Sequence, residues 1–158
     1  MGKSLSTGGT SVWVAQDDFL VKFDAVTKDV TRVEYPKDDA EYRHFREFRA
    51  LALDDNDNLW IGTYGGGLSL FNKNTAEFTT ISEIPDTANK KTSNVVWALH
   101  PDLSGKLWVG TWGAGLQLFN HETNTFENYN IVEQGSQSNN SVLSICRDFQ
   151  GFFWVGTY

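Results

Sequence analysis

Short apolar runs recur along the whole chain, and residues that favour turns separate them. In the stretch 95–131 the runs cover 95–99, 107–111, 116–119 and 126–131. Short runs that are rich in Val, Ile, Trp and Phe and bounded by Gly, Asn and Asp are typical of β-strands. We therefore predict four antiparallel strands in this stretch, named A, B, C and D in chain order.

One segment marks the same point in three successive copies of this pattern. It consists of Leu or Phe, then Trp, a β-branched residue, Gly, Thr and an aromatic residue. The Trp residues stand 48 and 46 residues apart, and a weaker copy surrounds Trp13. Several residue types recur in register over about 30 positions, which indicates an internal repeat. The Trp and Gly residues of the three copies are Trp60 and Gly62, Trp108 and Gly110, and Trp154 and Gly156.

The repeat predicts the fold class. Four antiparallel strands in about 40 to 50 residues form the blade of a β-propeller. We expect an all-β chain that forms one partial propeller, with units at about 1–44, 45–92, 93–139 and 140–158. The first unit is expected to begin at strand B and the last to stop after strand B, which gives about 13 strands, or about 3.3 blades. Because propellers usually need at least about four blades to close, we expect an incomplete propeller.

The segment 102–120 displays the repeat motif in full. It reads Asp-x-x-Gly, then Leu-Trp-Val-Gly-Thr-x-Gly-x-Gly-Leu, then Phe-Asn. With its copies, this motif resembles the two-component regulator propeller repeat, which builds extracytoplasmic sensor regions of bacterial hybrid histidine kinases and of some diguanylate cyclases. The first copy departs from the motif, because Ala15, Gln16 and Asp17 replace Gly, Thr and the aromatic residue.

The resemblance implies a function in signal transduction. Propellers of that family often sense saccharides in the periplasm and relay the signal across the membrane. By this resemblance, the chain is a fragment of a sensor propeller that binds a ligand, with a saccharide as the expected class. The kinase or cyclase lies outside the chain, so the chain itself is not expected to be an enzyme. The expected partners are the ligand and either the remainder of the propeller or a second copy.

Composition narrows the function classes further. The 158 residues include 13 basic and 20 acidic side chains, and a net charge of -7 argues against nucleic acid, which needs a basic face. Aromatic residues make up 14% of the chain, which favours an ordered structure. No apolar run approaches the roughly 18 residues of a transmembrane helix. The first ten residues lack the apolar stretch of a secretory signal. The single cysteine, Cys146, cannot form an internal disulfide.

The spacing of Trp and Gly is the same in each copy, which suggests that the two residues have a role in packing. The Gly follows the Trp by two residues and so lies on the same face of the strand. A small residue there can leave space for a large ring from the neighbouring blade. We therefore predict that Trp60, Trp108 and Trp154 wedge between blades, where large aromatic side chains bury much apolar area. Direct contact of these rings with a ligand is the alternative.

Aromatic residues at the tips of the B–C turns are the main candidates for ligand binding. In an antiparallel meander these turns share one face with the long D-to-A connections, here 36–47, 82–94 and 132–140. Binding residues concentrate in long loops on a rigid scaffold. Tyr64, Trp112 and Tyr158 occupy one repeat position on that face, and flat rings suit the apolar face of a sugar. The alternative is that these rings cap the blade edges.

Other candidate sites are weaker. His100 aligns with Asp54 and Cys146 near the end of strand A, and we expect it near a central channel as a further candidate for ligand contact. Asp54, Asn56 and Asn58 match the start of a calcium loop, but Leu follows where such a loop requires Gly, which favours a polar turn. The histidines lack metal-ligand spacing, so neither a metal site nor a cofactor is expected.

Two other function classes stay open. Propeller glycoside hydrolases and lyases also carry blades rich in Gly and Trp. Their sialidase-type Asp box places Asp five residues before its aromatic residue, whereas Asp102 precedes Trp108 by six. A structural platform for protein partners is the third class. In every case an open arc would expose strand edges, so we expect the chain alone to associate with itself or to be unstable.

Overall fold

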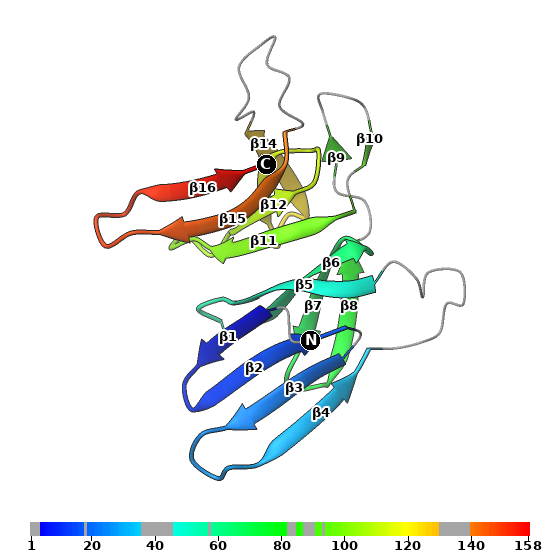
Figure 1. The fold of residues 1–158 in the computed structure, drawn as a ribbon, viewed down its shortest axis with the longest axis vertical. Helices are drawn as coiled ribbons and strands as arrows, with labels where there is room; N and C mark the ends of the chain where they lie inside the picture. The colour runs from blue at the N-terminus through cyan, green and yellow to red at the C-terminus, as the bar shows by residue number, and fades with distance from the viewer. Residues whose placement is uncertain are drawn as a thin grey trace.

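The described part of the chain consists of β-strands joined by turns (Figure 1). None of these residues belongs to a helix that is long and apolar enough to cross a membrane. The computed structural model describes residues 4–17, 19–35, 46–56, 58–81, 85–86, 91–92, 94–129 and 140–158.

The strands form sheets in chain order, and each strand pairs with the next in an antiparallel sense. The first sheet contains β1 (Ser4–Gly8), β2 (Ser11–Gln16), β3 (Phe19–Asp24) and β4 (Val30–Glu34). The second contains β5 (Arg46–Leu53), β6 (Leu59–Gly65), β7 (Leu68–Asn72) and β8 (Glu77–Ile81). The third contains β11 (Val96–Pro101), β12 (Leu107–Thr111), β13 (Leu116–Asn120) and β14 (Thr125–Tyr129). The last contains β15 (Val142–Arg147) and β16 (Phe153–Thr157). A separate hairpin consists of β9 (Pro85–Asp86) and β10 (Lys91–Thr92).

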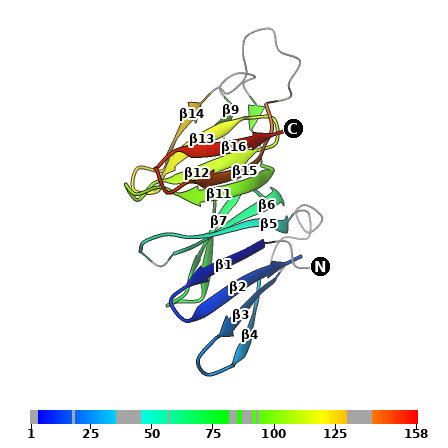
Figure 2. The same cartoon turned by 60° about the vertical axis from the view of Figure 1, so that its left-hand side comes forward.

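The sheets are arranged as successive blades of a propeller arc. The first strands of neighbouring sheets lie against one another, β1 on β5, β5 on β11, and β11 on β15. Figures 1 and 2 show the sheets following one another along the long axis of the molecule. The first strands therefore form the inner edge of the arc, and β4, β8 and β14 form its outer edge. This confirms the prediction of an all-β, incomplete propeller.

The first sheet differs from the prediction, because it contains a strand before strand B. The strand β1 pairs with β2 from Ser4 opposite Ala15 to Gly8 opposite Ser11. Its sequence, Ser-Leu-Ser-Thr-Gly, has one apolar residue, so the hydrophobic pattern does not mark it. Backbone pairing with a strongly apolar neighbour can recruit such a strand without a hydrophobic signal of its own.

Two hydrophobic clusters fill the seams between the sheets. In the first, Trp13 of β2 packs on Phe71 of the next sheet, with ring centroids 5.8 Å apart. In the second, Trp60 of β6 packs on Phe119 of the next sheet at 5.7 Å. All four rings are buried. Trp60 thus lies wedged between blades as predicted, and the ring that it meets comes from the third strand of the following sheet.

The repeated Gly has a different neighbour from the expected one. A Cβ at Gly62 would lie 2.5 Å from Cγ1 of Val96, and one at Gly110 would lie 2.6 Å from Cγ1 of Val142. Both valines belong to the first strand of the following sheet. The glycine therefore makes room for a valine and not for an aromatic ring, because the ring packs further along, on the Trp itself.

The three repeated Trp residues are not equally buried. Trp60 is 2% exposed, Trp108 is half-buried, and Trp154 is 63% exposed. Trp108 contacts Tyr129 of its own sheet at 5.0 Å and Phe153 of the last sheet at 5.4 Å. The wedge predicted for Trp154 is not realised within the described residues, since they include no sheet beyond β15 and β16.

Candidate ligand-binding site

The turns between the first and second strands are braced by an aspartate. One carboxylate oxygen of Asp54 accepts the backbone N–H groups of Asn56 (3.0 Å) and Asn58 (2.9 Å). The other accepts the indole N–H of Trp60 at 2.9 Å. Both oxygens are thus used by the turn, which supports the polar-turn interpretation over the calcium loop.

The same brace recurs in the last sheet but is altered in the third. Asp148 accepts the indole N–H of Trp154 at 2.8 Å, and this bond holds the pKa of the Asp148 carboxyl below its ordinary value. Asp102 instead accepts a hydrogen bond from the hydroxyl of Ser104, while the buried indole N–H of Trp108 has no hydrogen-bond partner among the described residues. These aspartates therefore hold turns.

The B–C turns are locked onto the sheet that follows. Thr63 Oγ1 donates to the carbonyl of Gly67 at 2.9 Å and closes the β6–β7 turn. The carbonyl of Asn94, just before β11, accepts the N–H groups of Gly65 (2.8 Å) and Gly67 (2.9 Å). The next turn has the same bond, from the N–H of Gly115 to the carbonyl of Asn140 at 2.8 Å. The aromatic residues at these turn tips are therefore held on a fixed scaffold.

The predicted residues Tyr64, Trp112 and Tyr158 lie along one line at this face. The rings of Trp112 and Tyr158 are 5.4 Å apart, and Trp97 lies 6.1 Å from Trp112. Tyr64 and Trp112 are each 41% exposed, and Tyr158 is 76% exposed. Their rings are thus partly open to solvent, as a ligand contact requires.

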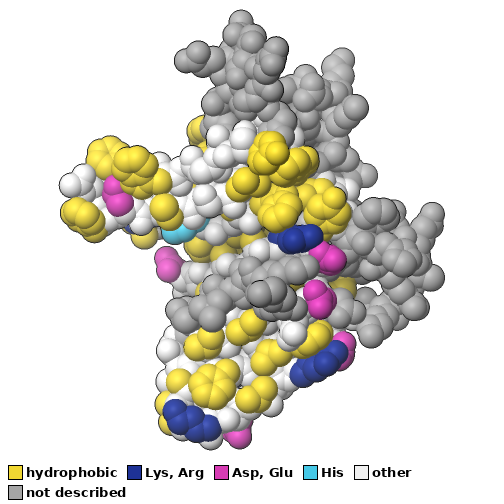
Figure 3. All heavy atoms as spheres, viewed as in Figure 1, with side chains coloured by type: hydrophobic (Ala, Val, Ile, Leu, Met, Phe, Trp, Pro, Cys, Tyr) yellow, Lys and Arg dark blue, Asp and Glu magenta, His cyan; other side chains and the backbone are white. Residues whose placement is uncertain are grey.

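Arg49 joins Tyr64 to the rest of this line. Its guanidinium carbon lies 4.8 Å from the ring centre of Trp97 and 5.1 Å from that of Tyr64. Glu47 accepts a hydrogen bond from the guanidinium at 2.6 Å, while no described residue is a hydrogen-bond partner of the buried Nε of Arg49. Figure 3 shows hydrophobic side chains beside a basic one on the face that carries the end of β16. We call this set the aromatic row: Tyr64, Arg49, Trp97, Trp112 and Tyr158.

Two members of the aromatic row, Arg49 and Trp97, were missed by the sequence reasoning. The pairing register shifts between Phe48 and Ala50 in β5, and at the same point of the repeat in β11. Arg49 and Trp97 are the extra residues of these β-bulges. A bulge re-aims a side chain that simple alternation would place elsewhere. The sequence does show that Arg49 and Trp97 occupy the same position of the repeat. It does not show that this position is a bulge, because the alternation of strand residues does not predict one.

His100 lies apart from the aromatic row. It pairs across the sheet with Trp108, near the opposite end of β11, and its ring lies 5.5 Å from Phe153. Burial lowers the pKa of His100 below its ordinary value, and the charge of Arg147 adds to this effect. Its repeat position is that of Ala52 and Cys146, which also pair with the strand-B Trp, so the predicted alignment with Asp54 is wrong.

The long connections 36–47, 82–94 and 132–140 lie mostly outside the described residues. Their expected contribution to the site therefore stays a prediction. What the described residues show is a platform made of the B–C turns and the bulges of β5 and β11.

Comparison with known proteins identifies the repeat. Residues 45–65 and 136–158 match the family model described as two component regulator propeller. Two segments of the chain therefore match the two-component regulator propeller repeat. The second matched segment includes Trp154, and the first includes Trp60 and Tyr64. A search among curated proteins finds no match.

Solved propeller structures resemble the chain over nearly its full length. One is described as the extracellular domain of a hybrid two component system from B. thetaiotaomicron; it is 25% identical, with a TM-score of 0.64 over 94% of this chain. PorZ of Porphyromonas gingivalis, 15% identical, has a TM-score of 0.69, and the Cps50 (Swd1) β-propeller domain of Myceliophteria thermophila, 14% identical, has 0.71. Both cover 99% of this chain. The chain spans 18%, 24% and 49% of these three proteins, respectively.

Proposed function

We propose that the chain is a segment of a periplasmic sensor propeller and that the aromatic row binds a saccharide. The repeat family and the likeness to the extracellular domain of a hybrid two component system support the sensor part. The signal would pass to a histidine kinase or a diguanylate cyclase that this chain does not contain. The remainder of the propeller would complete the binding face.

The aromatic row is the observation that carries the ligand class. Aromatic faces stack on the apolar faces of sugar rings, and a few placed polar groups fix their orientation. Here the rings of Tyr64 and Trp112 are partly exposed, and Arg49 and Glu47 supply a donor and an acceptor beside them. The row runs from the β6–β7 turn to the end of β16, across three sheets. An extended saccharide suits such a row better than a compact molecule does.

The test is a titration of the full chain with a panel of neutral and acidic oligosaccharides, followed by thermal melting and calorimetry. We expect at least one oligosaccharide to raise the melting temperature. Trp112→Ala should weaken its binding about fivefold or more, since stacking of this kind is worth about 1 kcal/mol or more. Phe149→Ala is the matched control, because Phe149 is 97% exposed and lies outside the row.

The other outcomes assign the chain to the other function classes. If no saccharide in a broad panel stabilises the protein, the assignment as a saccharide sensor is wrong, and a platform for protein partners becomes the proposed function. If an oligosaccharide of the panel is cleaved during the titration, and substitution of a carboxylate pair stops cleavage, the proposed function becomes that of a glycoside hydrolase or lyase. Equal weakening by Trp112→Ala and Phe149→Ala would remove the row as the binding site.

A further inference from the structure

A cavity of about 510 Å³ opens at the seam between the first two sheets, on the face opposite the aromatic row. It lies between the β1–β2 turn and the β7–β8 turn. These turns join first to second and third to fourth strands, so they lie at the other end of the strands from the B–C turns. Its lining residues are Gly9, Thr10, Ser11, Trp13, Lys22, Lys73 and Asn74.

The lining of this cavity is rich in hydrogen-bond donors. Lys22 and Lys73 carry ammonium groups, Thr10 and Ser11 carry hydroxyls, and Asn74 carries an amide. None of the described lining residues is acidic, although the chain as a whole has a net charge of -7. The nearby carboxylate of Asp24 accepts the N–H groups of Val26 and Thr27 through one oxygen and the hydroxyl of Thr10 at 3.4 Å through the other, and it interacts with the charge of Lys22. The donors of the lining that this carboxylate does not bond are therefore Ser11, Asn74 and the two lysines.

The cavity is built on braced turns. The side-chain oxygen of Asn72 accepts the N–H groups of Asn74 (2.9 Å) and Thr75 (3.3 Å), which fixes the β7–β8 turn. Nζ of Lys22 lies 6.0 Å from the ring centre of Trp13, which supports the base of the cavity. A binding group placed on fixed turns loses little conformational entropy when a ligand arrives.

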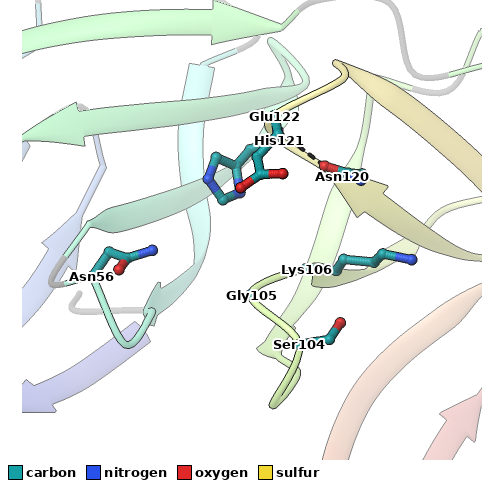
Figure 4. A pocket seen from close by; sticks show the side chains of 7 residues that line it. All are labelled: Asn56, Ser104, Gly105, Lys106, Asn120, His121 and Glu122. Atoms are coloured by element: carbon teal, nitrogen blue, oxygen red, sulfur yellow. Dashed lines mark hydrogen bonds between the residues drawn. The ribbon is translucent and has the colours of Figure 1, made fainter.

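The next seam provides an internal comparison. A cavity of about 350 Å³ lies there between Asn56, the turn from Ser104 to Lys106, and the turn from Asn120 to Glu122. Figure 4 shows His121 and Glu122 side by side, with Ser104 and Lys106 on the turn across from them. Here the carboxylate of Glu122 accompanies the single lysine. Both cavities lie between the first turn of one sheet and the third turn of the next, but the second is lined also by the β11–β12 turn and carries a carboxylate.

We propose that the first cavity, which we name the lysine notch, binds a small oxyanion such as a carboxylate or a sulfate group. Two ammonium groups and neutral donors around one cavity match the acceptor oxygens of such a group, and charge-assisted hydrogen bonds are the strong ones. The lysine notch lies on a different face from the aromatic row, so this proposal does not depend on the proposed function.

The test is calorimetric titration of the full chain with sodium sulfate, sodium glucuronate and glucose at constant ionic strength. We expect saturable binding of sulfate and glucuronate and none of glucose. Tighter binding of glucuronate would assign the notch to a sugar acid, and equal binding would assign it to the oxyanion group alone. The double variant Lys22→Gln with Lys73→Gln should weaken binding about tenfold or more, because it removes both charged donors of the notch.

Controls separate the notch from its surroundings. Lys106→Gln, in the neighbouring cavity, should leave the affinity unchanged, and so should Trp112→Ala in the aromatic row. If the double variant does not fold because Lys22 packs over Trp13, Lys73→Gln alone on the exposed turn provides the same comparison. Absence of saturable binding by both anions, binding of glucose equal to that of glucuronate, or equal weakening by Lys106→Gln would overturn the proposal.

Discussion

Single residues decide how closely neighbouring sheets approach. Gly62 and Gly110 each face a valine of the next first strand at a distance that leaves no room for a methyl group. Close to the same seams, the carbonyls of Asn94 and Asn140 accept N–H groups from the preceding B–C turn. The missing side chain at the glycine allows the close approach, and the hydrogen bonds to the asparagine carbonyl fix the position of the two sheets relative to each other.

Gly62→Ala should destabilise the chain by about 1–3 kcal/mol, because the new Cβ overpacks against Val96. Urea unfolding followed by circular dichroism measures the change in the free energy of unfolding. Val96→Ala alone is the control, and adding it to Gly62→Ala should recover part of the loss because the two side chains share one space. Strictly additive losses in the double variant would contradict this explanation.

At the scale of elements, the same ring contact recurs at the first two seams between sheets. The second-strand Trp packs on the third-strand Phe of the following sheet, as Trp13 does on Phe71 and Trp60 on Phe119. The indole N–H of Trp60 donates a hydrogen bond to Asp54, so the ring also connects the β5–β6 turn to the seam. The blade is therefore a unit that is completed only when the next blade covers its Trp.

The repeated Trp residues should consequently differ in their contribution to stability. Trp60→Ala should lower the free energy of unfolding by about 3–5 kcal/mol, as for a large buried aromatic residue. Trp154→Ala should lower it by less than about 1 kcal/mol, since its ring is 63% exposed and loses mainly a solvent-exposed bond to Asp148. Thermal and urea unfolding of the two variants compare them, and equal losses would contradict the seam model.

For the whole molecule, the last sheet is the open end of the arc. Only β15 and β16 belong to it among the described residues, and its aromatic side chains are exposed. Figure 3 shows hydrophobic side chains along the arm that this hairpin forms. Unpaired strand edges beside apolar side chains favour pairing with another chain. Its most exposed large apolar residues are Phe149, Phe152, Trp154 and Tyr158.

The isolated chain should therefore self-associate as its concentration rises through the micromolar range. Sedimentation velocity measures the distribution of species. Trp154→Lys should shift it toward the monomer, because it places a charge on the open face. Val26→Lys is the matched control, since Val26 is 70% exposed on the β3–β4 turn of the first sheet. A wild-type chain that stays monomeric throughout this range would contradict the prediction.

Local signals in the sequence predicted the blades and part of the candidate site. Apolar runs, turn residues and the spacing of Trp60, Trp108 and Trp154 act over a few residues, so the sequence alone indicates strands and their repeat. The strand β1 escaped because pairing with β2 compensates for its polar sequence. The position of Tyr64, near the end of β6, and of Trp112, directly after β12, beside the B–C turns also followed from the repeat, because strand alternation and turn glycines define where such a turn lies.

Only the tertiary structure decided which side chains meet. The bulges that bring Arg49 and Trp97 into the aromatic row depend on pairing between strands, and the valine opposite Gly62 comes from the following sheet. The exposure of Trp154 likewise depends on what packs beyond it and not on its own motif, which matches that of Trp60. Contacts between blades join residues far apart in the chain, so no local pattern can encode them.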